Sequence, residues 1–377
     1  MKKPCHMQAR GRIQGLRKPL IIAVLGAGNG GQAMAGWLAS RGCEVRLTDL
    51  FPNYLAPLRR LKAIELSGAV QAEGRVTVCR DPAGCVRGAD MIILATAAPG
   101  HKRLVARMAP GLTDGQVLLA TPGYFSSLTV PVYLKALGYK PRLVCAEAES
   151  LIYTCRSAEP GKVAVYFVKK KMGIGVQPQS EARRVLEMIR PFYPQMVDEG
   201  HSFKVALDNV NYALHPAILL FNAGWVEAAR GNWIFYKEGV TPSVIRAVEG
   251  LDAERLALGS AAGLRLTPVY KLLKKFYRVP GANHLLSLLQ RNPAYQNIQA
   301  PPVLDYRYFT EDVCYGLVPM AALSRKLGLA APVMDSIIRL ASLLLGRDLG
   351  RAGLRLSDMG LESLGRKELI RTLTGQA

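Results

Sequence analysis

Hydrophobic and polar positions follow two different patterns along the 377-residue chain. In the first half, short continuous apolar runs alternate with amphipathic stretches that have helical spacing. The runs cover residues 20–28, 43–50, 91–97, 115–123 and 142–148. Strands that alternate with helical segments predict a parallel sheet with crossover helices, and strands buried on both faces read as continuous apolar runs. We therefore expect an α/β, doubly wound parallel sheet of the Rossmann type in this half.

The second half of the chain has a different pattern. From about Ser202 onward, strand-like runs give way to long segments with 3.6-residue spacing, such as 303–329 and 334–346. This spacing predicts an all-helical domain. We expect a basic N-terminal extension over residues 1–18, a dinucleotide-binding Rossmann domain over 19–198 and a helical substrate domain over 199–377.

Composition narrows the class of protein. Half of the residues are apolar, which is enough for a sizeable core, and no apolar run reaches the roughly 18 residues of a transmembrane helix. The basic N-terminus is not followed by the cleavage pattern of a signal peptide. The seven cysteines are odd in number and form no CxxC pair, which favours free thiols over disulfides or a metal site. We expect a cytoplasmic protein without a metal centre or a membrane partner.

The net charge of +21 raises the possibility of nucleic-acid binding. The positive charge is spread along the chain, however, and no zinc-finger spacing or aromatic-interleaved basic motif accompanies it. A basic surface also steers anionic small molecules. We therefore expect small-molecule ligands and no nucleic-acid partner.

A glycine-rich fingerprint follows the first predicted strand, in the sequence IIAVLGAGNGG at residues 21–31. Gly26 would permit a tight turn, Gly28 a close approach to a pyrophosphate, and Gly31 close packing of helix on strand. Asn29 lies between them at the start of the predicted helix, whose free N–H groups attract phosphate. These residues predict a dinucleotide site.

An acidic residue at the end of the next strand supports the same site. Asp49 lies 21 positions beyond Gly28, where a carboxylate can bind the adenosine ribose. An acid there favours NAD, because the 2′-phosphate of NADP would meet a like charge. NADP stays possible because three arginines lie near in the sequence, Arg46, Arg59 and Arg60.

Candidate acid–base chemistry lies in the second half. His215 follows two asparagines in LDNVNYALHP, residues 207–216, and histidine suits proton transfer near neutral pH. Asp312 and Arg307 lie in the apolar, aromatic segment 305–319, where charged side chains are costly unless they are paired or functional. The carboxylate could orient the histidine, and the arginine could bind a substrate carboxylate. A buried structural histidine and an internal Arg–Asp ion pair are the alternatives.

The sequence resembles the octopine/nopaline (opine) dehydrogenase family over nearly its whole length from Leu20. The resemblance rests on the segments GAGNGGQAMAGWLASRG, ATAAPGH, AEAESLIYTCR, NVNYALHPAILLFNAG, LDAERLALGSAAGL and YRYFTEDVCYGLVP, and on the closing segment 327–364. The pairing of NxNxxxHP with TEDVxYGLVP carries the most weight. The sequence departs from the family pattern at Ala148 and Ile152, and it lacks a second glycine after Gly123.

The resemblance implies a function. Enzymes of this family join the amine of an amino acid to an α-keto acid, commonly pyruvate, and NAD(P)H reduces the imine to a secondary-amine dicarboxylate. By motif position, His215 and Asp312 would be the acid–base dyad and Arg307 would bind the amino acid, in a pocket flanked by Asn209, Asn211 and Asn222. His101, at the end of ATAAPGH, would lie beside the cofactor, and a homodimer is expected.

Two other interpretations remain open at this point. A ketopantoate-reductase-like enzyme would share the architecture and reduce a keto acid directly, but such enzymes typically rely on a lysine. A non-catalytic dinucleotide-binding or nucleic-acid-associated protein would have the fold without turnover, and would have no need of His215, Arg307 and Asp312 together.

Overall fold

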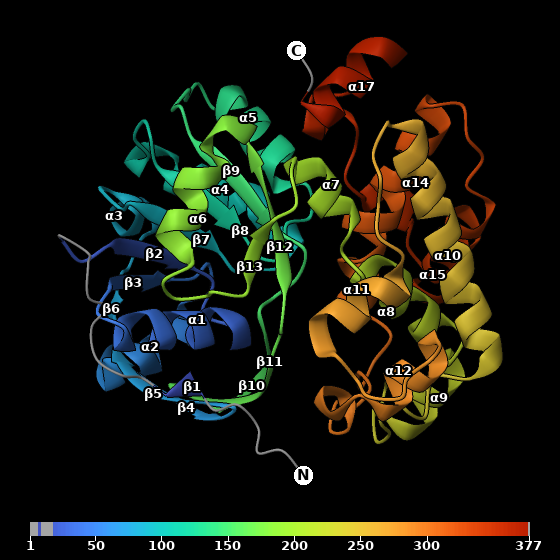
Figure 1. Cartoon of the computed structure of the whole chain (residues 1–377), viewed down its shortest axis with the longest axis horizontal. Helices are drawn as coiled ribbons and strands as arrows, with labels where there is room; N and C mark the ends of the chain where they lie inside the picture. Colours follow the sequence, from blue (N-terminus) through green and yellow to red (C-terminus); the bar gives the residue numbers. More distant parts are fainter. Residues whose placement is uncertain (1–6, 9–17, 376–377) are drawn as a thin grey trace. The chain divides into compact units, whose positions relative to one another are not determined.

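The computed structural model describes residues 7–8 and 18–375, which divide into two units between Val205 and Ala206. Figure 1 shows the chain coloured from its N-terminus to its C-terminus. Most of the predicted N-terminal extension, residues 1–6 and 9–17, lies outside the described residues. The two units are described separately below.

The first unit is built on an eight-stranded sheet (Figure 1), with the order β13-β12-β9-β8-β7-β2-β3-β6. Its strands are β2 (Ile21–Leu25), β3 (Glu44–Thr48), β6 (Thr77–Val78), β7 (Met91–Leu94), β8 (Val117–Ala120), β9 (Val144–Ala148), β12 (Met172–Gln177) and β13 (Met196–Asp198). The six strands from β6 to β9 are parallel, and β12 pairs antiparallel with β9. The chain passes from β2 to β3 on one side and returns to β7 on the other, which confirms the predicted doubly wound sheet and places its switch point beside β2.

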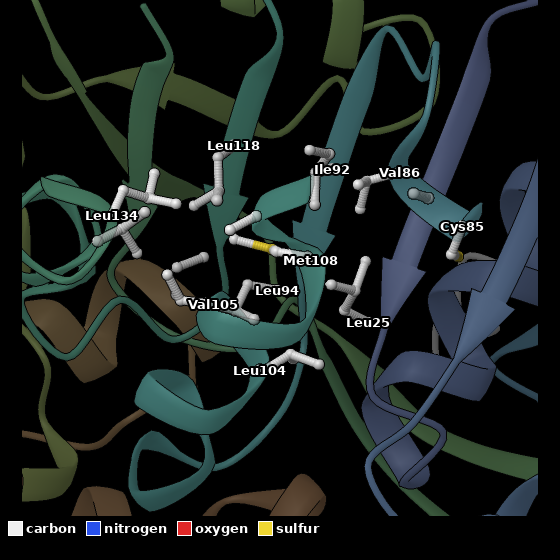
Figure 2. Packing of buried hydrophobic residues seen from close by; sticks show 14 of the residues in the cluster. Leu25, Cys85, Val86, Ile92, Leu94, Leu104, Val105, Met108, Leu118 and Leu134 are labelled. Carbon is white, nitrogen blue, oxygen red and sulfur yellow. The ribbon is translucent and has the colours of Figure 1, made fainter. Parts of the chain in front are cut away.

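Helices and short 3-10 turns connect these strands. They are α1 (Asn29–Ser40), α2 (Pro52–Leu61), α3 (Pro82–Val86), η1 (Ala98–Gly100), α4 (His101–Met108), η2 (Ala109–Gly111), α5 (Ser126–Ala136), η3 (Gln179–Glu181) and α6 (Ala182–Ile189). Figure 2 shows Leu104, Val105 and Met108 of α4 packed against Leu94 and Leu118 of the sheet. This core cluster draws on α3, α4 and α5 but on no residue of α1, which packs instead against β2, β3 and a second sheet.

The second sheet was not predicted from the sequence. Its order is β1-β5-β4-β11-β10, from β1 (Met7–Gln8), β4 (Ala63–Gly68), β5 (Val70–Arg75), β10 (Tyr153–Glu159) and β11 (Lys162–Val168). Strands β4 and β5 alternate between buried and exposed residues and are joined by a tight turn, so they lack the continuous apolar runs that marked the main sheet. A Cβ at Gly74 of β5 would lie 2.1 Å from the Gly36 oxygen of α1, so glycine allows this strand and helix to touch backbone to backbone.

The second unit is helical, as predicted. Its elements are α7 (Ser202–Leu207, which crosses the division), α8 (Asn211–Leu220), α9 (Ala223–Ala229), α10 (Pro242–Ala261), α11 (Val269–Tyr277), α12 (Leu285–Arg291), η4 (Pro293–Tyr295), α13 (Arg307–Thr310), the π-helical turn η5 (Val313–Leu317), α14 (Val318–Lys326), α15 (Pro332–Leu345), α16 (Leu349–Ala352), η6 (Ser357–Met359) and α17 (Arg366–Thr374). The longest helix, α10, begins with a Thr241 side-chain cap and Pro242 in its first turn, which is a strong start signal.

Two observations concern membranes and metals. Among residues 7–8 and 18–375, no helix combines the length and the apolar character needed to cross a bilayer. The same residues contain no cluster of three or more His, Cys, Asp or Glu side chains that could hold a metal ion.

Candidate active site

The glycine fingerprint forms the turn between β2 and α1. Gly26 has a φ of +121°, and a Cβ there would lie 2.5 Å from the carbonyl oxygen of Ala95 at the end of β7. A Cβ at Gly31 would lie 1.8 Å from the Gly26 oxygen. Both positions therefore require glycine, the first for the turn and the second for the close approach of helix and strand.

Gly28 differs from these two glycines. Its backbone is extended, and a Cβ there would contact no atom of the described chain within 4 Å. No side chain caps the first turn of α1, so its backbone N–H groups are available to an anion. This open backbone at a helix N-terminus fits the pyrophosphate of a dinucleotide. The Asn29 side chain has a separate task, because its Oδ1 accepts a hydrogen bond from the Ser157 backbone N–H at 2.9 Å.

Asp49 lies at the end of β3, beside the same loop. Its Oδ2 accepts a hydrogen bond from the Ala27 N–H at 2.6 Å, and its Oδ1 accepts one from the Phe51 N–H at 2.9 Å. The carboxylate is thus oriented by backbone, and each oxygen has a second lone pair for a ribose hydroxyl. Arg46, one of the three arginines that kept NADP possible, bonds to Glu44 and to the Arg87 carbonyl.

His101 begins α4, after the strand β7 that borders the glycine loop. The side chain is buried, and a ring nitrogen lies 3.2 Å from the Thr96 carbonyl oxygen. Burial lowers the pKa of His101 from 6.5 to about 4, against the opposing effect of the Thr96 hydrogen bond. The ring is therefore neutral at physiological pH.

In the helical unit, the structure brings together the two residues predicted to form a dyad. His215 lies within α8 and is 3% exposed, and Asp312 lies immediately before η5 and is fully buried. His215 Nδ1 is 2.7 Å from Asp312 Oδ2. These residues are 97 positions apart in the sequence and belong to the two motifs on which the family resemblance mainly rests. A buried carboxylate in this position fixes the tautomer of the imidazole.

Aromatic residues that the sequence reasoning did not single out surround His215. The Tyr236 hydroxyl lies 2.6 Å from His215 Nε2. The Tyr308 ring stacks on the imidazole, with centroids 3.9 Å apart and an interplanar angle of 23°. Phe235 meets the imidazole edge-on at 6.3 Å. The aromatic pairs in 306–309 and 235–236 were the available signal, but aromatic residues at such spacing usually belong to an ordinary core.

Arg307 extends this stack. Its guanidinium lies over the Tyr308 ring, 5.3 Å from the centroid, and the same ring stacks on His215. Arg307 Nη1 is also 3.6 Å from Glu311 Oε2. The Arg307 side chain is 45% exposed, whereas that of Glu311 is 4% exposed. The arginine therefore keeps a solvent-facing surface close to the dyad.

The three asparagines differ in their surroundings. Asn209 is buried and its Oδ1 accepts a hydrogen bond from the Asn211 N–H at the start of α8. Its Nδ2 has no hydrogen-bond partner among the described residues. Asn222 uses both amide hydrogens on backbone carbonyls, those of Ile218 at 2.8 Å and Gly239 at 2.9 Å. Asn222 thus ties the end of α8 to the segment that precedes α10.

A buried glutamate in the first unit was also missed. Glu147 of β9 is fully buried and accepts hydrogen bonds from the Ser127 hydroxyl at 2.5 Å, the Ser127 N–H at 2.8 Å and the Phe125 N–H at 3.1 Å. Burial raises its pKa from 4.5 to about 7, more than these hydrogen bonds lower it. An acidic residue inside the fully buried strand VCAEA was the signal for it. Nearby, Tyr124 has a φ of +50° in the segment where a second glycine was expected.

A large surface groove lies elsewhere in the helical unit. It has a volume of about 1130 Å³ and is lined by residues of α14, α15, α16 and the segment that follows them. None of the predicted site residues lines it. The groove is therefore separate from the dyad.

Comparisons with known proteins identify the family. Residues 199–345 match the family model described as NAD/NADP octopine/nopaline dehydrogenase, alpha-helical domain, and residues 21–121 match one described as NADP oxidoreductase coenzyme F420-dependent. An opine dehydrogenase of Arthrobacter sp. (strain 1C) is 34% identical over 351 residues, which cover 91% of this chain and 95% of that protein. Protein ocs of Agrobacterium vitis is 28% identical over 94% of this chain and 99% of its own length.

Solved structures show the same fold. Octopine dehydrogenase in complex with NADH and agmatine superposes with a TM-score of 0.75 at 21% identity, covering 95% of this chain and 98% of its own. A ketopantoate reductase from Ralstonia eutropha reaches a TM-score of 0.60 at 16% identity over 86% of this chain and 98% of its own, so that likeness is one of fold alone. The whole-length similarity in sequence lies with the opine dehydrogenases. The chain belongs to the opine dehydrogenase family of NAD(P)-dependent oxidoreductases that act on CH–NH donors.

Proposed function

We propose that this enzyme condenses the amine of an amino acid with an α-keto acid, pyruvate in the first instance, and reduces the imine to a secondary-amine dicarboxylate, or runs the reverse oxidation. The observation that carries the proposal is the buried pair of His215 and Asp312, 2.7 Å apart. Octopine dehydrogenase, whose fold this chain shares, forms complexes with NADH and L-arginine and with NADH and pyruvate.

His215 is the proposed acid–base group. An ionised carboxylate can only accept hydrogen bonds, so Asp312 holds the hydrogen on Nδ1 and leaves Nε2 for proton exchange. The same carboxylate stabilises the imidazolium that forms when Nε2 takes up a proton. This arrangement suits the loss of water from the carbinolamine and the protonation changes at nitrogen.

Arg307 is the proposed partner of a substrate carboxylate. Its guanidinium is half-exposed and contacts Tyr308, the ring that stacks on His215. Arginine binds carboxylates through two parallel hydrogen bonds, which positions the substrate as well as attracting it. The unpartnered Asn209 amide supports a role for the start of α8 in the same pocket, which would be flanked by Asn211 and Asn222.

The proposed cofactor residues are Gly26, Gly28, Asn29, Gly31 and Asp49 of the fingerprint region, with His101 beside them. When bound, the nicotinamide supplies the hydride. The residues present fit a dinucleotide because Gly28 leaves the helix N-terminus open and Asp49 is oriented by backbone N–H groups. Asp49 favours NAD over NADP by charge. A yersinopine dehydrogenase of similar fold has been solved with NADP+, so the preference needs measurement.

We also infer a division of labour between a cofactor domain over residues 19–198 and a substrate domain over 199–377, and a cytoplasmic homodimer. Exposed leucines on α15 support a dimer, because Leu340, Leu343 and Leu344 are 45%, 75% and 45% exposed. Light scattering coupled to gel filtration would measure the mass in solution, and a monomeric mass at micromolar concentration would contradict the dimer.

The test is NADH oxidation with purified protein, pyruvate and a panel of single amino acids. The proposal expects turnover that needs both substrates and that collapses in His215→Ala and Asp312→Asn while NADH still binds. His284→Asn serves as a matched control, because His284 is an exposed helix cap outside the site and asparagine also caps helices. Oxidation with the keto acid alone would contradict the proposal and identify a simple keto-acid reductase.

A further inference from the structure

The imidazole of His215 has no ring nitrogen left over. Nδ1 is bonded to Asp312 and Nε2 to the Tyr236 hydroxyl, and Tyr308 covers one face of the ring. The side chain of His215 is only 3% exposed. A proton that leaves Nε2 therefore meets the oxygen of Tyr236 first.

The direction of each hydrogen bond follows from the chemistry of the groups. The Asp312 carboxylate accepts, so Nδ1 of a neutral His215 carries the hydrogen and Nε2 is an acceptor. The Tyr236 hydroxyl must then donate to Nε2, across 2.6 Å. When His215 becomes an imidazolium, the bond reverses, because Nε2 then donates to the phenolic oxygen. In that state the hydroxyl hydrogen of Tyr236 is released to another acceptor.

The surroundings of Tyr236 keep its side chain a neutral phenol, which can either donate a hydrogen bond to His215 Nε2 or accept one from it. The residue is buried, and its ring stacks on Tyr295 with centroids 4.2 Å apart and an interplanar angle of 20°. Burial raises the pKa of Tyr236 well above 10, so the side chain remains a neutral phenol in the physiological range. A neutral phenol can accept one hydrogen bond and donate another at the same time.

We propose that Tyr236 relays the proton between His215 and the substrate, so that the working unit is a chain of three groups, Asp312, His215 and Tyr236. This inference rests on the proposed function and deepens it. The 2.6 Å contact between the Tyr236 hydroxyl and His215 Nε2 carries it. Packing alone does not account for the hydroxyl, since a phenylalanine would stack on Tyr295 equally well.

The relay balances in atoms and electrons. In the condensing direction, the hydroxyl hydrogen of Tyr236 moves to the departing oxygen of the carbinolamine as the proton on Nε2 moves to the phenolic oxygen. The C–O bond breaks, water leaves, and the nitrogen lone pair forms the C=N bond. The bound nicotinamide would supply the hydride that reduces this C=N bond to the secondary amine. In the reverse direction each proton moves back along the same path.

The test compares Tyr236→Phe with Tyr277→Phe. The second variant is a matched control. Tyr277 is also buried and meets Tyr295 edge-on at 5.0 Å. Tyr277→Phe therefore removes the same hydroxyl from a ring that is separated from His215 by Tyr295 and Tyr236. Two measurements are made on both. Nitrogen-15 NMR of the cofactor-free protein reports the state of the His215 ring nitrogens. Single-turnover NADH oxidation in mixtures of H2O and D2O reports how many protons move in the chemical step.

The relay predicts a specific split between the two variants. Tyr236→Phe should shift the Nε2 resonance towards that of an unbonded imidazole nitrogen, lower the single-turnover rate by about 10²-fold, and leave NADH affinity unchanged. Its rate should depend linearly on the D2O fraction, as for one moving proton, where the wild type shows the curvature of two. Tyr277→Phe should remain within about threefold of the wild type, with the wild-type curvature.

Several outcomes would overturn the relay. These are an unchanged Nε2 resonance in Tyr236→Phe, a rate within about threefold of the wild type, or curvature that persists in Tyr236→Phe. A wild-type protein that binds NADH but turns over no pair of amino acid and keto acid would instead defeat the proposed function, while the NMR result alone would still decide whether the hydrogen-bonded chain exists.

Discussion

Two clusters of buried polar side chains lie in the helical unit, and they differ in whether a proton can be exchanged within them. One is the ion triad of Arg255 with Asp208 and Asp252, with distances of 2.7 Å to each acid. The other is the group of His215, Asp312 and Tyr236. Each includes residues from motifs that marked the family resemblance, Arg255 and Asp252 in one and His215 and Asp312 in the other, and both are shielded from solvent.

The Arg255 cluster is saturated. The guanidinium donates from Nε, Nη1 and Nη2 to the two acids and to the backbone carbonyls of Leu207 and Thr267. The acids in turn accept from the backbone N–H groups of Thr267 and Val269, just before and at the start of α11. The triad thus ties α10 to the segments on either side of it, and every N–H of the guanidinium already has an acceptor.

The His215 cluster keeps capacity for exchange. Its members are a titratable imidazole and a phenol, whose shared hydrogen can sit on either partner, and Arg307 at its edge is half-exposed. Burial and charge are common to both clusters and so do not separate structure from function. The ability to pass a proton does separate them, because an arginine stays protonated whereas an imidazole and a phenol can exchange their shared hydrogen.

The largest expected effect follows from breaking the dyad. Asp312→Asn replaces an acceptor by an amide that can stabilise the wrong tautomer of His215, so we expect kcat to fall by about 10³- to 10⁴-fold. The melting temperature should change by only a few degrees, because the amide fills the same space. Steady-state kinetics and thermal unfolding on one preparation measure both. A fall in kcat of less than tenfold would contradict a functional role for the His215 cluster.

Removing the centre of the triad should affect stability instead. Arg255→Met leaves two buried carboxylates without their partner, so we expect the free energy of unfolding to fall by about 3–5 kcal/mol. The kcat of the folded fraction should remain near that of the wild type. Denaturant unfolding measures the loss.

The control for this variant is Arg325→Met. Arg325 also pairs with a carboxylate, that of Asp335, but the two side chains are 56% and 45% exposed. An exposed pair contributes less than about 1 kcal/mol. If both variants lost the same free energy of unfolding, the buried Arg255 triad would be no more stabilising than an exposed ion pair.

Glu147 extends the comparison of buried polar groups to the first unit, through the pH dependence of stability. Its folded-state pKa of about 7 exceeds the usual 4.5, so the folded protein prefers the protonated form. The contribution of Glu147 to the free energy of unfolding is complete below about pH 4.5 and falls by about 3 kcal/mol as the pH rises to 7. We expect Glu147→Gln to remove this dependence, as measured by denaturant unfolding at several pH values.

His101 provides the opposite slope in the same range. Its pKa falls from 6.5 to about 4 in the folded state. The contribution of His101 to stability is therefore present above pH 6.5 and is lost as the pH falls towards 4. The informative quantity is therefore the difference between wild type and Glu147→Gln at each pH. A difference that stays constant from pH 4.5 to 7 would contradict the raised pKa of Glu147.

The smallest expected effect concerns Asn222, which was predicted to flank the substrate pocket. Because both amide hydrogens already bind backbone carbonyls, we expect Asn222→Ala to lower the free energy of unfolding by about 1–2 kcal/mol with little change in the KM of either substrate. A large rise in the KM of the amino acid, with stability intact, would place Asn222 with the functional cluster instead.

Local sequence patterns were sufficient for part of this site. Gly26 and Gly31 lie where the turn and the helix contact require glycine, and their spacing was readable because strand, turn and helix are contiguous in the chain. Asp312 was proposed as a partner of His215 from its costly place in an apolar segment, and the family resemblance strengthened that hypothesis. Nothing in the spacing of residues 97 positions apart indicates that their side chains meet.

The parts that were missed depend on contacts between distant segments. The β4–β5 hairpin pairs with the distant strand β11 and packs on α1 through Gly36 and Gly74, and its alternating pattern gave a weak strand signal. Glu147 lay inside an apolar run and was read as part of a strand alone. Its pKa arises from burial beneath the 121–127 segment, which no local pattern reports.

By itself, the sequence determined the doubly wound sheet, the helical second half and the nucleotide-binding turn, because each depends on periodicity or on residues close together in the chain. Only the tertiary structure decided that Tyr236 meets Nε2 of His215, that Tyr308 contacts both Arg307 and the imidazole, and that Asn222 binds backbone. The physical reason is that a hydrogen bond needs its donor and acceptor within about 3 Å. The packing of the helices sets that distance for residues far apart in sequence.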